Sequence, residues 1–138
     1  MIRVVVDPGV FISALIGTRG GAPDVVVRAF IDERITVVAS PLLLAELDRV
    51  LRRPKFARYG DERTRREFVE RVRRHATVAE DPVNAPPVTR DRRDDYLVAL
   101  ARQERVDAIV SGDRDLLDAG QDEPPVWSPR QLADRILE

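Results

Sequence analysis

The 138-residue sequence predicts an α/β fold, a three-layer α/β/α sandwich with a mostly parallel central sheet. Short runs of β-branched residues alternate along the chain with longer segments whose apolar residues recur at helical spacing. Two of the buried-strand runs end in acids, at Asp7 and at Asp113. Because ligands bind outside the carboxyl ends of the strands in such sheets, these acids point to the functional edge.

The first part of the chain predicts two strands, each preceding a helix. The run over 2–6 is rich enough in valine for a strand that is buried on both faces. A short helix is expected over 10–16, with Pro8 at a place that a first helical turn tolerates. One-sided apolar spacing predicts an amphipathic helix over 22–31, and a second buried strand is expected over 35–39.

The middle of the chain predicts two helices and an edge strand. Ser40 is expected to cap a leucine-rich helix that Pro54 ends. Glu46 stands beside the apolar stripe of that helix, where most glutamates are ordinary surface residues. A further helix is expected over 61–75, followed by a short edge strand over 77–79.

A cluster of aspartates opens the next predicted helix. After a proline-rich loop over 81–87, the chain carries Asp91, Asp94 and Asp95, and then an apolar helical run over 96–101. One aspartate is well explained as a helix cap or a first-turn acid, but three within five residues are not. Adjacent carboxylates repel each other unless a cation or an arginine lies between them.

The last part of the chain repeats the pattern of the first. A buried strand is expected over 106–111, and Asp113 follows it directly. A short strand over 126–127 and a closing helix over 130–137, capped by Ser128, complete the prediction.

The composition excludes several kinds of site. The chain has no cysteine, so disulfides, thiolate metal ligands and cysteine nucleophiles are excluded, and its single histidine argues against zinc and against a histidine-based triad. No apolar run approaches the length that crosses a bilayer, and the start of the chain lacks a signal-peptide pattern. We therefore expect a cytoplasmic protein that does not associate with membranes.

The net charge of −1 argues against a protein that coats nucleic acid through overall positive charge. The basic residues are nevertheless segregated, because the stretch 49–74 contains eleven of them and only four acids, a local charge of +7. Arginine suits phosphate contact, although a solvated helix face explains such a run more often.

The acids of separate segments are expected to meet at one edge of the sheet. These are Asp7, Glu46, the pair Asp94 and Asp95, and Asp113. Several carboxylates that lie close together cannot all stay ionised without a partner, because their charges repel each other. A bound cation would offset this repulsion. Oxygen ligands without cysteine select a hard ion such as Mg²⁺ or Mn²⁺, and magnesium held by few carboxylates takes phosphate oxygens as further ligands. The acids therefore predict phosphodiester chemistry.

Three segments resemble a known family. They read VVVDPGVFISAL near the start, SPLLLAELDRVLRRPKF in the middle and TRDRRDDYLVALA…VDAIVSGDRDLL near the end. Through them the chain, taken over 1–138 as a single domain, resembles the PIN domain, the ribonuclease fold of VapC-type toxins. It looks most similar to the branch of PIN toxins from type II toxin–antitoxin systems.

The resemblance implies a metal-dependent endoribonuclease, and it places the catalytic acids residue by residue. They fall on Asp7, Glu46, Asp94, Asp95 and Asp113. All of these except Glu46 would hold Mg²⁺ or Mn²⁺ directly, and Glu46 would do so directly or through water. Which of Asp94 and Asp95 is the principal ligand stays open. Polar residues expected to support the site are Ser13, Ser111 and Asp115.

The resemblance also implies partners. RNA would be the substrate, and its backbone would be steered by electrostatics through Arg52, Arg53, Lys55 and Arg58. A cognate antitoxin protein would insert a segment into the acidic groove, and the toxin would form a homodimer or a higher homo-oligomer.

The first motif departs from the common family pattern. Many PIN domains read Asp-Thr-Asn-Val there, whereas this chain has Pro8 and Gly9 after Asp7. The two missing polar side chains would have supplied hydrogen bonds that tune metal affinity. The alternative function is therefore a catalytically weakened PIN-fold module that binds RNA or a protein.

Three other functions compete with RNA cleavage. A phosphatase of the haloacid-dehalogenase type requires Asp-x-Asp after the first strand, but Gly9 occupies the position of the second aspartate. A receiver domain requires a lysine at the end of a late strand, but the only lysine of this chain is Lys55. Cleavage of DNA by the same acids stays open.

Overall fold

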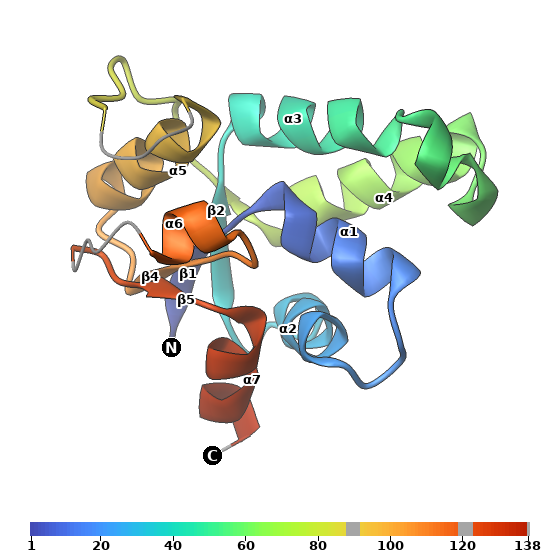
Figure 1. Cartoon of the computed structure of the whole chain (residues 1–138), viewed down its shortest axis with the longest axis horizontal. Helices are drawn as coiled ribbons and strands as arrows, with labels where there is room; N and C mark the ends of the chain where they lie inside the picture. Colours follow the sequence, from blue (N-terminus) through green and yellow to red (C-terminus); the bar gives the residue numbers. More distant parts are fainter. Residues whose placement is uncertain (88–91, 119–122, 138) are drawn as a thin grey trace.

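The computed structural model describes residues 1–87, 92–118 and 123–137, except for the side chains of residues 92 and 93. Its strands form one sheet in the order β3-β2-β1-β4-β5, and every neighbouring pair is parallel (Figure 1). The predicted α/β fold with a mostly parallel sheet is confirmed. The strands are β1 (Arg3–Val6), β2 (Thr36–Ala39), β3 (Thr77–Val78), β4 (Ala108–Val110) and β5 (Val126–Trp127).

Helices cover both faces of this sheet. In Figure 1, α5 lies on one side of the strands, and α1, α2 and α3 lie on the other side or across its upper end. The helical segments are α1 (Pro8–Ile16), α2 (Ala22–Ile31), α3 (Pro41–Leu51), the 3₁₀ segment η1 (Pro54–Tyr59), α4 (Glu62–His75), α5 (Arg92–Gln103), α6 (Arg114–Leu117) and α7 (Pro129–Leu137).

Strand β1 is the centre of the sheet, between β2 and β4. Its three valines are at most 1% exposed, because helices cover both faces, and this explains why the strand reads as a continuous apolar run. Val6, the last residue of β1, lies opposite Val110, the last residue of β4. The residues that follow these two strands therefore emerge side by side at the carboxyl edge.

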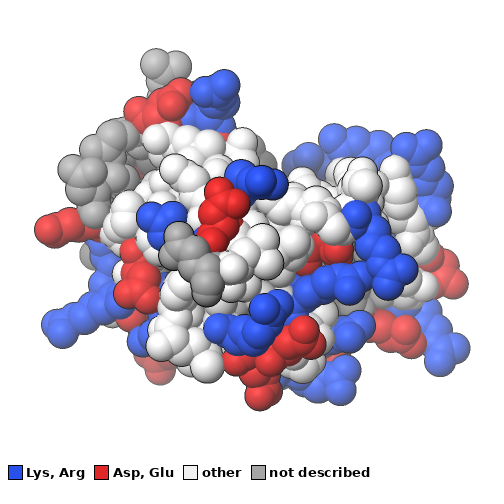
Figure 2. Space-filling model, turned by 90° about the horizontal axis from the view of Figure 1, so that it is seen from below, with Lys and Arg blue, Asp and Glu red and all other residues white. Residues whose placement is uncertain are grey.

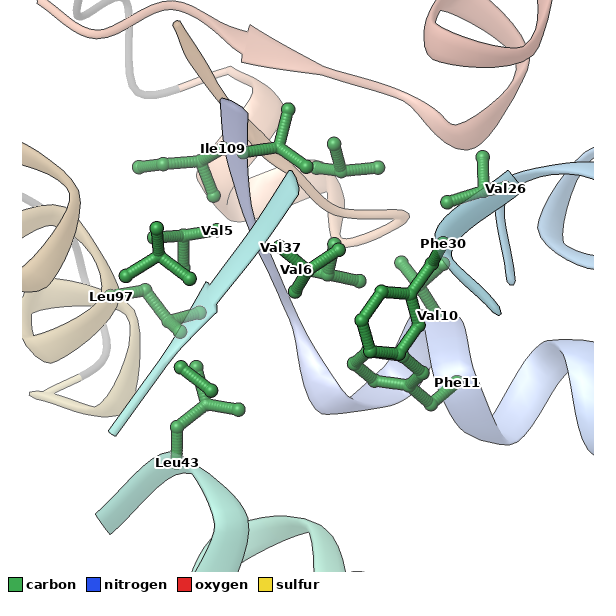
Figure 3. Packing of buried hydrophobic residues seen from close by; sticks show 14 of the residues in the cluster. Val5, Val6, Val10, Phe11, Val26, Phe30, Val37, Leu43, Leu97 and Ile109 are labelled. Atoms are coloured by element: carbon green, nitrogen blue, oxygen red, sulfur yellow. The ribbon is translucent and has the colours of Figure 1, made fainter. Parts of the chain in front are cut away.

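The core fills the space between the sheet and the helices. Figure 3 shows Leu97 of α5 on one side of the strands and Phe11 and Phe30 on the other. The two phenylalanine rings meet edge to face with their centroids 5.9 Å apart, and both are nearly fully buried. This packing holds α1 and α2 in place and so fixes the start of α1, where the first acid lies.

The predicted helix caps are confirmed. The hydroxyl of Ser40 accepts a hydrogen bond from the amide of Leu43 at the start of α3 (3.3 Å). At the start of α7, Ser128 and Gln131 each donate a backbone amide to the other's side chain, at 2.8 and 3.1 Å. Because caps act over three residues, they can be read from the sequence.

Several boundaries differ from the prediction, and two of the differences bear on the site. Helix α1 begins at Pro8 rather than at residue 10, because the Asp7 side chain accepts from the amide of Gly9 and caps the helix two residues earlier. After Pro54 the chain forms η1, where no further helical turn was expected. Asp91, the first acid of the predicted cluster, lies outside the described residues. No helix in the described ranges is both long enough and apolar enough to cross a membrane.

Candidate functional site

A pocket of about 640 Å³ opens at the carboxyl edge of the sheet, where β1 and β4 end. Four carboxylates line it, each from a different segment of the chain. They belong to Asp7 after β1, Glu46 on α3, Asp94 in the first turn of α5 and Asp113 before α6. The parallel topology thus brings together acids that are far apart in the sequence.

Asp7 is held through both its backbone and its side chain. Its amide donates to the carbonyl of Val110 (2.9 Å), which continues the ladder between β1 and β4. Its carboxylate accepts from the amide of Gly9 (3.1 Å) and from the hydroxyl of Ser111 (2.8 Å). Both side-chain oxygens are therefore held in fixed directions beside the pocket.

The environment raises the pKa of Asp7 above its ordinary value of 3.8. Burial is the largest cause, since a low-dielectric surrounding disfavours the charged form. The negative charges of Asp113 and Glu46 raise the pKa further, and the hydrogen bonds from Gly9 and Ser111 oppose the shift only in part. Burial and the neighbouring carboxylates therefore both disfavour the ionised form of Asp7.

Ser111 joins the two strand ends that carry acids. Its fully buried hydroxyl donates to Asp7 and accepts a hydrogen bond from the amide of Asp113 (3.0 Å). Asp113 in turn accepts from the amide of Asp115 (2.9 Å), which caps α6. The supporting role predicted for Asp115 is filled here by its backbone, while the predicted Ser13 lines the pocket from α1.

The other predicted acids take different positions. Glu46 lines the pocket and is also held by two hydrogen bonds from Arg49, at 2.6 and 3.0 Å. Asp94 and Asp95 are both buried, each 5% exposed, but only Asp94 is among the lining residues of the pocket as described. The structure thus separates two neighbours that the sequence left equivalent.

Whether these residues suit a metal depends on how closely they gather. Within the described part of the chain, no group of three or more acids or histidines is arranged to hold an ion together. That Asp7, the pair Asp94 and Asp95, and Asp113 hold an ion therefore stays a prediction. The oxygen donors still suit Mg²⁺ or Mn²⁺, because magnesium is commonly held by one or two carboxylates, with waters and substrate phosphates completing its shell. The raised pKa of Asp7 fits such an open site.

A hydrogen-bond network beside the pocket was not predicted. The hydroxyl of Tyr96, which lines the pocket from α5, donates to Asp81 and is hydrogen-bonded to Ser40. Asp81 also accepts from the amide of Leu42 in the first turn of α3, at 3.1 and 3.3 Å. This network ties α5, the loop after β3 and the start of α3 together.

The surroundings of the network favour an ionised Asp81 and a protonated Tyr96. Burial opposes ionisation of Asp81, but the hydrogen bonds from Ser40, Tyr96 and Leu42 together lower its pKa. Burial and the bond to Asp81 raise the pKa of Tyr96 above the usual range. No sequence signal marks these partners, because Asp81 lies in a proline-rich loop 15 residues before Tyr96 and 39 after Leu42.

The four predicted RNA-contacting residues lie at one end of the molecule. Figure 2 shows Lys and Arg side chains gathered at the right-hand end, where Figure 1 places the end of α3, η1 and the start of α4. Arg52 pairs with Asp48, Lys55 lies over the ring of Phe56, and Arg58 donates to the hydroxyl of Tyr59. Arg53 is the member of this set that lines the pocket.

Comparisons with known proteins agree with this fold. The family model described as PIN domain matches residues 3–115. An uncharacterized protein from Methanocaldococcus jannaschii is 30% identical over 116 residues, which cover 84% of this chain and 74% of that relative. The crystal structure of PAE2754 from Pyrobaculum aerophilum is similar with a TM-score of 0.63 and 19% identity, covering 99% of this chain and 90% of the other. At that identity the structural likeness speaks for the fold alone.

Proposed function

The chain belongs to the PIN domain family, and from that premise we propose that it is a Mg²⁺- or Mn²⁺-dependent endoribonuclease. PIN domains are in general nucleases, which supports hydrolysis of phosphodiester bonds. The observation that carries the proposal is the pocket into which four carboxylates from separate segments converge. Carboxylates that line an enclosed pocket are costly to ionise unless a cation is bound there. A bound divalent cation can in turn hold an anionic substrate.

The residues around the pocket would have different roles in such a reaction. Asp7 and Asp113, which Ser111 links, would hold the divalent ion, with Asp94 and Glu46 contacting it from the facing helices directly or through water. When bound, the ion supplies an activated water and stabilises charge on the phosphate. The hydroxyl of Ser111 keeps the carboxylate of Asp7 turned in one direction, as outer hydrogen bonds commonly do for metal ligands.

The substrate and partners extend this proposal. The basic stretch 49–74 would attract the nucleic-acid backbone, and its salt dependence would follow from the release of counterions. Resemblance to VapC-type toxins supports RNA as the substrate, a cognate antitoxin as the partner and a homodimer or larger homo-oligomer as the assembly. Growth arrest on expression of the wild type, relieved by Asp7→Asn, would support the toxin role, and unaffected growth would count against it.

A nuclease assay tests the central proposal. With Mn²⁺ and matched single-stranded RNA and DNA, we expect the wild type to cut RNA, and Asp7→Asn or Asp113→Asn to lose activity by about 100-fold. A matched control is Asp134→Asn, which removes an exposed carboxylate of α7 that pairs with Arg130 (3.2 Å). Full activity in either pocket variant would reject the assignment, and preference for DNA would change the substrate.

A binding module without catalysis is the second candidate. Pro8 and Gly9 supply no polar side chain next to Asp7, and three acids are not gathered for one ion in the described structure. Calorimetry with Mn²⁺ separates the two candidates. A nuclease shows saturable binding of Mn²⁺ that Asp113→Asn weakens, whereas a pure binding module retains RNA without measurable heat from the metal.

A further inference from the structure

The cations at the end of α3 differ in whether they already have a partner. Arg49 is engaged by both oxygens of Glu46, and Arg52 is bound to Asp48 at 2.9 and 3.0 Å. By contrast, the guanidinium of Arg53 makes no hydrogen bond or ion pair with any residue that the structure describes. Arg53 therefore keeps its full capacity to bind an anion, unlike its two neighbours.

The position of Arg53 follows from the end of the helix. A residue before proline is disfavoured in helical conformation, and Arg53 before Pro54 is accordingly extended, with φ −60° and ψ 137°. Arg53 thereby leaves α3 and reaches the wall of the pocket, where it is the one Lys or Arg among the lining residues with described side chains.

One face of α3 leads from the acids to this cation. Leu43, Glu46 and Val50 of α3 line the pocket, and their spacing of three and four residues keeps them on one helical face. Arg53, three residues after Val50 and just beyond the end of α3 at Leu51, lines the same pocket. The pocket wall therefore carries a carboxylate at Glu46, an apolar side chain at Val50 and a cation at Arg53, in that order along the chain.

We propose that Arg53 forms a subsite for single-stranded RNA. It would bind a phosphate group other than the one that is hydrolysed at the carboxylates. This inference rests on the proposed function and names how its substrate is held. The guanidinium fork matches phosphate oxygens in a bidentate way, and the apolar side chain of Val50, between Glu46 and Arg53, suits a base or ribose between two phosphates. A pocket of about 640 Å³ has the size of a small-ligand site, which accepts a single strand and not a duplex.

Binding of a short fluorescent single-stranded RNA, measured by anisotropy in EDTA so that the strand stays intact, tests the subsite. We expect Arg53→Ala to weaken binding about tenfold, the usual loss for one hydrogen-bonded charge, and Arg53→Lys to weaken it less. The control Arg28→Ala removes a charge of α2 that is paired with Asp24 (3.1 Å) and lies outside the basic stretch 49–74, and its binding is expected to stay within about twofold of the wild type. The salt slope of Arg53→Ala is expected to be smaller in magnitude by about 0.7, the value for one phosphate contact on a single strand.

The two proposals fail in different ways. Equal weakening by Arg53→Ala and by the control Arg28→Ala, or an unchanged salt slope, would overturn the subsite even if the wild type cuts RNA. An Arg53-specific loss of single-strand binding would uphold the subsite, and a wild type that cuts nothing with Mn²⁺ would then reject only the nuclease. A duplex RNA that binds as tightly as the single strand and depends equally on Arg53 would overturn the restriction to single strands.

Discussion

At the scale of single residues, Asp7 links stability to pH. Its pKa is raised in the folded chain, so folding favours its protonated form. The stabilising contribution is complete below the ordinary value of 3.8 and is lost as the pH rises through the raised folded value. At neutral pH without metal, the ionised Asp7 therefore costs stability.

The variant Asp7→Asn tests this linkage. Asparagine caps helices as well as aspartate does, so α1 keeps its start while the charge is removed. We expect its Tm without metal to exceed that of the wild type by a few degrees at neutral pH, with the difference disappearing near pH 4. Added Mn²⁺ is expected to raise the Tm of the wild type and not that of the variant. Equal Tm values across this pH range would contradict the assignment.

Gly9 offers a second test at this scale. A Cβ built at Gly9 would meet only the Asp7 carboxylate, at 3.7 Å, so the position has room for a side chain. Gly9→Asn is expected to fold normally and to bind Mn²⁺ up to about tenfold more tightly, because it restores a polar group beside Asp7. Gly60→Ala is the contrast: with φ +156° and Thr64 atoms within 2.7 Å of a Cβ, it is expected to lower the Tm. Calorimetry and thermal melts measure both effects.

At the scale of elements, the Tyr96 network connects α5 with the start of α3, two helices that both line the pocket. Removing the hydroxyl in Tyr96→Phe leaves Asp81 and Ser40 without that partner. We expect a loss of about 1–2 kcal/mol in the free energy of unfolding, measured with urea. Phe56→Leu in η1, outside this network, is the control for a general loss of aromatic packing. A variant as stable as the wild type would show that the network contributes nothing.

The elements themselves were predictable wherever their signals are local. Residues 22–31 are read as a helix from their apolar spacing, and the structure gives the same bounds for α2. Ser40 and Ser128 mark helix starts through bonds that span three residues. The link between Asp81 and Tyr96 was not predictable, because it depends on where a loop and a distant helix meet after folding.

At the scale of the whole molecule, charge is distributed unevenly. Lys55 and Arg58 have no carboxylate partner in the described structure, and they lie at the basic end formed by α3, η1 and α4. We expect the double variant Lys55→Ala/Arg58→Ala to lower kcat/KM for RNA several-fold at low salt. The difference is expected to vanish near 1 M salt, where screening acts within about 3 Å. A loss that persists at high salt would indicate direct contact and not steering.

The convergence of acids was predictable from topology, but their fine positions were not. Parallel strands deliver Asp7 and Asp113 to one edge whatever the details of packing. That Asp94 and not Asp95 lines the pocket depends on the rotation of α5 about its axis, which packing on the sheet sets. The distances among the carboxylates likewise follow from side-chain packing and cannot be read from the sequence, and within the described residues no three acids or histidines are grouped to hold one ion.

The register of β1 has a consequence for the order in which the molecule acquires its pocket. Val4 lies beside Val37 on one side, but its partner on the other side is Ala108. A nascent polypeptide still emerging from the ribosome therefore carries Asp7 long before β4 and Asp113 exist to face it. If the folded protein degrades RNA, it cannot do so during its own translation until the segments that carry Asp94 and Asp113 have been synthesised.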